Sequence, residues 1–107
     1  MKKTITNLIL ASFFIATSTT IQAQDVMVDG KKLFTQAVPA CALCHVMSHA
    51  GGLGEIGPSL DELKPNAARV AKALRNGIGQ MPAFKTLTDE QVTLLSKYVA
   101  TATGAGK

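Results

Sequence analysis

Two thiols and one imidazole lie within five consecutive residues, in the run Cys41-Ala42-Leu43-Cys44-His45. Cysteines three residues apart lie on one side of a helical turn, where each thiol can add to one of the two vinyl groups along a porphyrin edge. The adjacent histidine is then delivered to the iron from one face of the ring. C-x-x-C-H is the attachment motif of c-type haem. It predicts one covalent haem c on Cys41 and Cys44, with His45 as an axial iron ligand.

Three other uses of these cysteines stay open as minor alternatives. A thioredoxin-like redox pair belongs to a larger mixed sheet, and the sequence has no strand pattern that would build one. A zinc site could recruit His45 and His49, but the cysteine pair directly abuts the histidine pair, so one short segment would have to surround a tetrahedral ion. A local disulfide would make the chain a small structural domain.

The iron of such a haem needs a second axial ligand on the opposite face. The candidates are Met27, Met47, His49, Met81 and solvent. Met47 and His49 are too close to His45 along the chain to reach across the ring. Met81 is favoured over Met27 because it lies in the glycine-rich loop 77–82, where glycines permit a close approach and Pro82 stiffens the exit.

The chain has 107 residues, which permits one small domain. Residues 1–23 have the pattern of an export signal: two lysines, a short apolar run that is too short to span a bilayer, and a small residue at Ala23. We therefore expect a signal peptide over 1–23, a single domain over 24–107, and a periplasmic mature chain without stable membrane insertion. An uncleaved N-terminal anchor stays open as a minor alternative, because Ile21 is larger than the residue usual three positions before a cleavage site. The net charge of +4 falls by two without Lys2 and Lys3, and no cluster of basic and aromatic residues indicates nucleic-acid binding.

Apolar periodicity and capping signals predict an all-α domain. Thr88 and Gln91 form a capping-box pattern, which predicts a helix that begins at Asp89. Residues 24–28 are expected to form a mobile start. The capping-box helix is expected to end near Thr101. Three other helical segments are expected: 30–37 with Asp29 as N-cap, a single turn over 59–63, and 65–76 with Pro65 as its first residue and Gly77 as its stop.

Only three aromatic residues outside the expected signal peptide are available for a core, namely Phe34, Phe84 and Tyr98. A domain of this size often needs a disulfide, a metal or a cofactor to become stable. A flat macrocycle of haem size would supply the missing apolar volume.

An ordered set of short patterns resembles the class I monohaem cytochromes c. The matching residues are Gly30 and Phe34, the motif 41–45, Gly57-Pro58-Ser59-Leu60, Met81-Pro82, and Leu95 with Tyr98. The resemblance implies a small cytochrome c fold of three to four helices around one haem. It also implies that Gly30 permits a close crossing of the first and last helices, with Phe34 and Tyr98 at the contact, and that the Pro58 carbonyl accepts a hydrogen bond from the His45 ring.

The function that follows is single-electron transfer in the periplasm, between a dehydrogenase and a higher-potential cytochrome or oxidase acceptor. Residues 54–82 look similar to the small cytochromes that serve bacterial sulfite dehydrogenases, which suggests a stable electron-accepting subunit as the alternative. A haem-based sensor remains a third possibility, and catalysis by the chain itself is not expected because no catalytic arrangement is visible beyond the haem motif. Arg69, Lys72 and Arg75 are interpreted as a solvated helix face.

Overall fold

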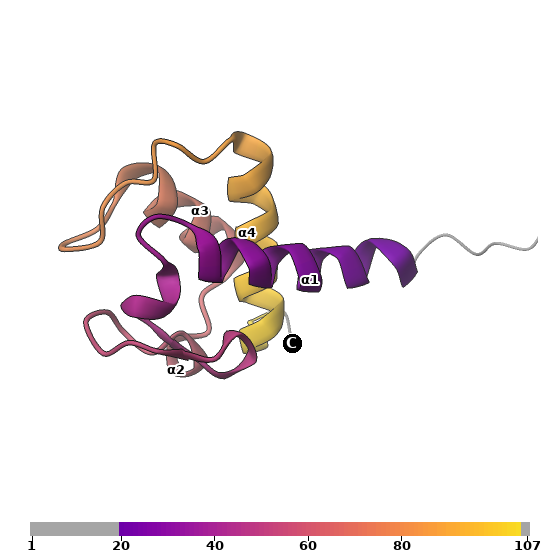
Figure 1. Ribbon diagram of the computed structural model, residues 1–107, viewed down its shortest axis with the longest axis horizontal. Helices are drawn as coiled ribbons and strands as arrows, with labels where there is room; N and C mark the ends of the chain where they lie inside the picture. The colour runs from indigo at the N-terminus through magenta and orange to yellow at the C-terminus, as the bar shows by residue number, and fades with distance from the viewer. Residues whose placement is uncertain (1–19, 106–107) are drawn as a thin grey trace, which may run out of the picture.

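Four α-helices make up most of the computed structural model, which describes residues 20–105 (Figure 1). They are α1 (Thr20–Gln36), α2 (Leu60–Leu63), α3 (Ala67–Asn76) and α4 (Asp89–Thr103). The all-α prediction is confirmed. Two 3₁₀ turns, Cys41–Leu43 and Ser48–Ala50, lie between α1 and α2. None of the described helices combines the length and hydrophobicity that crossing a membrane requires.

Helix α1 begins earlier than the sequence analysis predicts. Residues 24–28 are helical instead of mobile, and Asp29 lies inside the helix, so its assignment as N-cap is wrong. The physical reason is that Val26 and Met27 pack against the core, and this packing continues the helix across a segment without a strong periodic pattern. The expected signal peptide lies outside the described residues except for 20–23, which belong to α1.

Helices α1 and α4 cross closely at Gly30 (Figure 1). A Cβ atom at this position would overlap the Cβ and Cγ atoms of Tyr98. The Phe34 and Tyr98 rings meet edge to face beside the crossing, with their centroids 6.2 Å apart. The contact that the resemblance implies is therefore present.

Local capping fixes the ends of α3 and α4. The Thr88 hydroxyl and the Gln91 side chain form the predicted capping box at the start of α4. Helix α3 begins two residues later than predicted because Asn66, not Pro65, leads into it: the Asn66 side chain accepts a hydrogen bond from the Arg69 N–H at 2.8 Å. Gly77 ends α3 as predicted, whereas α4 continues to Thr103.

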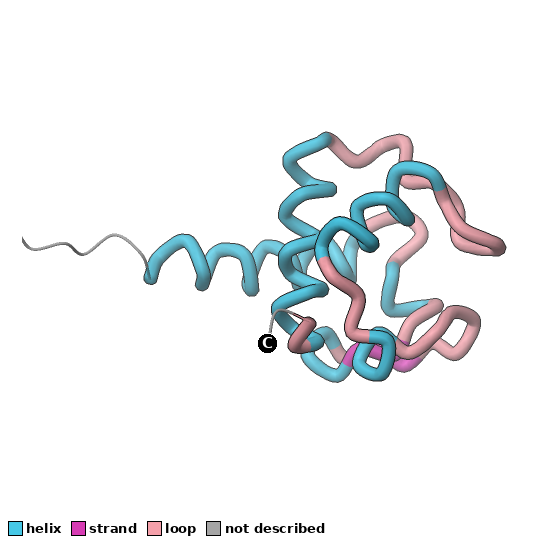
Figure 2. The backbone as a smooth tube through the Cα atoms, turned by 180° about the vertical axis from the view of Figure 1, so that it is seen from behind, coloured by secondary structure: helices cyan, strands magenta, loops and turns pink. Residues whose placement is uncertain are grey.

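A two-stranded antiparallel ladder is present although no strand was predicted. It pairs β1 (Val46–Met47) with β2 (Gly52–Leu53) and is the short magenta segment in Figure 2. Each strand has two residues, which is too short for an alternating sequence pattern to reveal it. The hairpin folds residues 51–54 back onto the cysteine motif.

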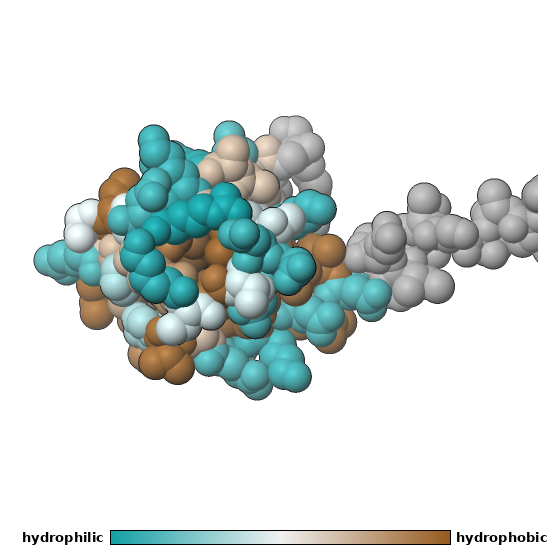
Figure 3. Space-filling model, turned by 90° about the horizontal axis from the view of Figure 1, so that it is seen from above, coloured by the Kyte–Doolittle hydropathy of each residue, from teal (hydrophilic) through white to brown (hydrophobic). Residues whose placement is uncertain are grey.

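The core contains all three aromatic residues that the sequence analysis assigned to it. Phe34, Phe84 and Tyr98 are buried together with aliphatic residues of α3 and α4 and with Met47. The face shown in Figure 3 is mostly hydrophilic, and hydrophobic residues are visible in a hollow of that face. The helices and the loops 37–59 and 77–88 surround a cavity, in which the predicted site residues lie.

Candidate functional site

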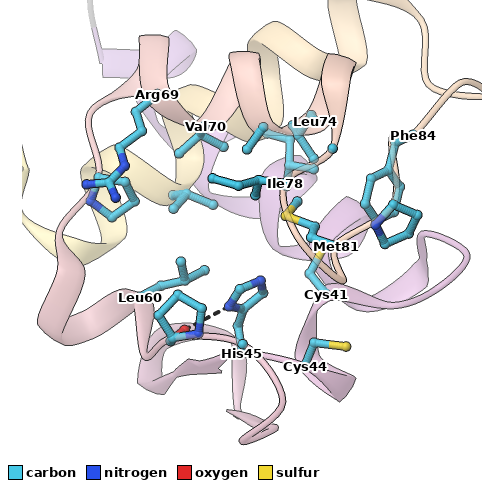
Figure 4. A pocket seen from close by; sticks show the side chains of 18 of the residues that line it. Cys41, Cys44, His45, Leu60, Arg69, Val70, Leu74, Ile78, Met81 and Phe84 are labelled. Atoms are coloured by element: carbon cyan, nitrogen blue, oxygen red, sulfur yellow. Dashed lines mark hydrogen bonds between the residues drawn. The ribbon is translucent and has the colours of Figure 1, made fainter.

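One cavity of about 600 Å³ collects side chains from all four helices and from the loops between them (Figure 4). Its size lies within the range of roughly 300–1,000 Å³ that is usual for cofactor sites. Most of its lining is hydrophobic: Phe34, Leu60, Leu63, Val70, Leu74, Phe84, Leu95 and Val99. Cys41, Cys44, His45, Pro58 and Met81 also line it, so the fold brings all five predicted site residues to the same space.

The two cysteines enter the cavity from a 3₁₀ turn. This turn spans Cys41–Leu43, and Cys44 follows as its last residue, with its N–H donating to the Cys41 carbonyl at 3.1 Å. Side chains three residues apart are nearly eclipsed in a 3₁₀ turn, so both thiols lie on one side. Both are free thiols. The geometry thus presents two thiols to one edge of whatever occupies the cavity.

Burial raises the pKa of the Cys41 thiol to about 11, and the neighbouring Cys44 adds to the rise. The Cys41 sulfur is therefore protonated at neutral pH. A redox-active or zinc-binding cysteine requires a thiolate in an electropositive setting. The environment of Cys41 fits a sulfur that is capped by a carbon bond better than either of those uses.

The His45 ring is oriented by a backbone carbonyl. Its Nδ1 lies 2.8 Å from the Pro58 oxygen, and the ring is buried. A carbonyl can only accept, so in the neutral imidazole Nδ1 carries the hydrogen and Nε2 keeps its lone pair. Figure 4 shows the ring extending into the cavity beyond this hydrogen bond. The arrangement leaves Nε2 as the nitrogen available to bind a metal.

Gly57 makes room for this ring. A Cβ atom at Gly57 would lie 2.5 Å from Cε1 and 2.8 Å from Nδ1 of His45. The Gly57 N–H donates to the Cys44 carbonyl at 2.7 Å, which fastens the loop to the cysteine motif. Gly52 and Gly54 likewise lie too close to the backbone of residues 42–45 to accept a side chain. The glycine-rich loop is therefore organised by its close packing on the motif.

Met81 reaches the cavity from the loop between α3 and α4. Ile78 and Met81 exchange two backbone hydrogen bonds of 3.0 and 2.9 Å, which close a tight turn, and Gly79 within it has a φ of +55°. The Phe84 N–H donates to the Leu74 carbonyl at 2.7 Å and fastens the loop to α3. Figure 4 shows the Met81 sulfur and the His45 ring approaching the cavity from different walls.

The other candidates for the second axial position lie elsewhere. Among the residues that the structure describes, Met27, Met47 and His49 do not line the cavity. Met47 is fully buried in the core, and Met27 packs on the outside of that core. His49 directs its Nδ1 to the Tyr98 hydroxyl at 2.8 Å. Within residues 20–105, no three His, Cys, Asp or Glu side chains converge as a zinc site would require.

Arg69 and Lys72, interpreted from the sequence as part of a solvated helix face, line the cavity. Both are exposed, as a solvated face requires, but they also border the cavity. Only Arg75 of the three basic residues faces away, toward Asp89 at 3.5 Å. A signal was available, because Lys72 directly precedes Ala73 and Arg69 directly precedes Val70, two apolar lining residues of α3.

A flat macrocycle with apolar faces, two vinyl carbons at one edge and an iron at its centre fits these residues. The apolar walls suit its faces, the two thiols suit its vinyl edge, and the imidazole and thioether suit the two axial positions. Together with the helical fold, this site defines a c-type cytochrome.

Comparison with known proteins identifies the family. Residues 25–99 match the family described as cytochrome c oxidase, cbb3-type, subunit III, and the chain belongs to this family of cytochrome c domains. The crystal structure of the c-type cytochrome SorU from Sinorhizobium meliloti is similar to it, with 48% sequence identity and a TM-score of 0.73 over 76% of this chain and 94% of that chain. Among proteins with curated descriptions, none matches. The protein is a monohaem class I cytochrome c that carries one covalently bound haem c.

Proposed function

We propose that this cytochrome is a periplasmic single-electron carrier in which Cys41 and Cys44 form the thioether links to haem. In this proposal His45 and Met81 are the axial ligands, and Pro58 orients the His45 ring. The observation that carries the proposal is the cavity itself, into which the His45 ring and the Met81 sulfur project beside both thiols.

When bound, the haem supplies an iron that alternates between the ferric and ferrous states by one electron. The chain contributes the conditions for this change. The hydrogen bond from His45 Nδ1 to the Pro58 carbonyl fixes the tautomer and strengthens donation from Nε2. The Met81 thioether raises the reduction potential within the range open to haems. The apolar walls, among them Leu74 and Phe84, exclude water from the metal.

A carrier agrees with this ligand set better than an enzyme does. If His45 and Met81 both hold the iron, they would leave no position open for a substrate. The cavity lining contains no carboxylate within the described residues, and its cysteines are committed to the cofactor. A sensor would need an iron that opens easily, whereas the Met81 loop is held by backbone hydrogen bonds on both of its sides.

The proposed partners are a periplasmic dehydrogenase as donor and a higher-potential cytochrome or oxidase as acceptor. The signal-peptide pattern of residues 1–23 supports the compartment. The resemblance of residues 54–82 to cytochromes that serve sulfite dehydrogenases supports a dehydrogenase donor, and it favours a stable electron-accepting subunit as the second candidate. Co-purification with the donor at nanomolar concentration would identify a subunit, and rapid dissociation would identify a shuttle.

Visible spectroscopy of the holoprotein tests the ligand assignment. The full-length chain is expressed with haem-maturation machinery, and spectra are recorded oxidised, reduced and in alkaline pyridine. We expect a thioether-linked haemochrome and the weak sulfur-to-iron band of the oxidised form. A protein that stays colourless under these conditions would overturn the proposal.

Two methionine variants then separate ligation from packing. Met81→Ala should abolish the sulfur-to-iron band and let the reduced protein bind carbon monoxide. Met47→Ala removes a fully buried core side chain and should lower stability by about 2–5 kcal/mol while the band remains. Carbon monoxide binding by the parent protein without denaturant would instead favour the sensor.

A further inference from the structure

Arg69 lies at the side of the cavity remote from the cysteines, and we propose that its guanidinium binds the haem propionates. The inference rests on the proposed function, because it assumes that the thiols of Cys41 and Cys44 hold the vinyl edge. It adds a positioning residue that also sets the reduction potential of the iron.

The chemistry of the haem fixes where its carboxylates must go. The two vinyl groups and the two propionates lie on opposite edges of the porphyrin. Anchoring the vinyl edge at Cys41 and Cys44 therefore directs the propionates toward the far side of the cavity. Figure 4 shows Arg69 and the two cysteines on different sides of the cavity, with the His45 ring between them. A guanidinium thus lies where the anionic edge of the cofactor is expected.

The charges of the lining agree with this placement. Arg69 and Lys72, both from α3, are the only permanently charged side chains that line the cavity within residues 20–105, and no Asp or Glu lines it. The lining residues from α1, α2, α4 and the loop 77–84 are uncharged. The remaining titratable residues of the lining are the two cysteines and His45, which the haem engages. Two cations thus border a space that receives a ligand with two carboxylates.

Arg69 is a better carboxylate partner than its neighbours on α3. A guanidinium can donate two parallel hydrogen bonds to one carboxylate, which an ammonium such as that of Lys72 cannot do. Arg75 lies outside the lining and faces Asp89. The Arg69 backbone N–H is held by Asn66 at the start of α3, so the position of its Cα is fixed independently of its side chain.

The test compares Arg69→Gln with Arg75→Gln in the holoprotein. Both variants lose one positive charge from the same helix, but only one loses a cavity residue. Redox potentiometry is carried out from about pH 3 to 8, a range that includes the ordinary carboxyl pKa of about 4.3. A cation beside a carboxylate lowers its pKa by about one to three units, so the propionates of the parent stay ionised and its potential is flat. In R69Q we expect a lower potential that falls further as pH rises, with the redox-linked pKa raised by about one to three units.

The results distinguish this inference from the proposed function. R69Q and R75Q curves that coincide, with haem bound in both, would overturn the role of Arg69 and leave the carrier proposal intact. A parent protein without covalent haem would overturn the carrier proposal first. If R69Q accumulates poorly, Arg69→Lys takes its place, because lysine keeps the positive charge but cannot donate two parallel hydrogen bonds to one carboxylate. A redox-linked pKa above that of the parent then supports the inference, and an unchanged curve rejects it.

Discussion

Replacing Gly57 by alanine tests the link between the glycine loop and the His45 ring. The added Cβ would lie 2.5 Å from Cε1 and 2.8 Å from Nδ1, whereas ordinary contacts begin at about 3.4 Å. The ring must therefore retreat by roughly 0.9 Å. The hydrogen bond from Nδ1 to the Pro58 oxygen is now 2.8 Å, and such a movement would take it beyond the upper limit of about 3.2 Å.

The expected loss of stability combines three terms. Overpacking costs about 1–3 kcal/mol, and loss of the hydrogen bond costs about 0.5–1.5 kcal/mol. Against these losses, replacing glycine by alanine stabilises the fold by about 0.4–1 kcal/mol, because alanine restricts the unfolded chain. The holoprotein of Gly57→Ala should thus unfold with a free energy about 0.5–4 kcal/mol below that of the parent. Its reduction potential should rise, because His45 donates less strongly without the carbonyl acceptor.

Guanidinium unfolding measures the free energy of unfolding, and potentiometry measures the reduction potential. Gly51→Ala is the matched control, since Gly51 has a φ of +67°, its Cβ would meet nothing within 4 Å, and it does not line the cavity. It should lose about 1–3 kcal/mol through backbone strain with no change in potential. A Gly57→Ala protein with the stability and the potential of the parent would refute the argument.

Three further predictions concern the crossing helices and the titrating side chains. Gly30→Ala should lower the stability measured by guanidinium unfolding by more than about 1 kcal/mol although alanine favours helices, because the new Cβ overlaps Tyr98. The control Asp29→Ala, at an exposed position of the same helix, should stay within about 0.5 kcal/mol of the parent. Burial raises the pKa of Tyr98 from 10.0 to about 12, so stability should fall as pH rises through this window, and Tyr98→Phe should lack that part of the fall. Hydrogen bonds from the Ser48 hydroxyl and N–H hold the pKa of Asp61 below its ordinary 3.8, so the parent should lose more stability than Asp61→Asn as pH falls below that value.

Each of these three predictions can be contradicted by a specific result. A Gly30→Ala protein as stable as the parent would mean that the helices can separate at little cost. An alkaline slope that persists unchanged in Tyr98→Phe would assign it to other groups. Equal acid sensitivity of the parent and Asp61→Asn would mean that the two Ser48 hydrogen bonds do not favour the ionised carboxylate.

Elements whose signals are local could be predicted from the sequence. The capping box of Thr88 and Gln91 involves only groups three positions apart, so the start of α4 followed directly. The start of α1 did not follow, because it depends on the packing of Val26 and Met27 against residues far along the chain. The two-residue strands at Val46–Met47 and Gly52–Leu53 likewise depend on the fit of a glycine loop to the cysteine motif.

The sequence by itself determined the kind of cofactor and predicted its site, since Cys41, Cys44 and His45 lie within five consecutive residues and their spacing alone matches one edge and one face of a haem. It also favoured Met81 by eliminating residues too close to His45. Only the tertiary structure decided which ring nitrogen of His45 is free, because the Pro58 carbonyl comes from a later loop. It alone placed Arg69 on the cavity, because whether an edge position of a helix faces solvent or a ligand depends on what packs opposite it.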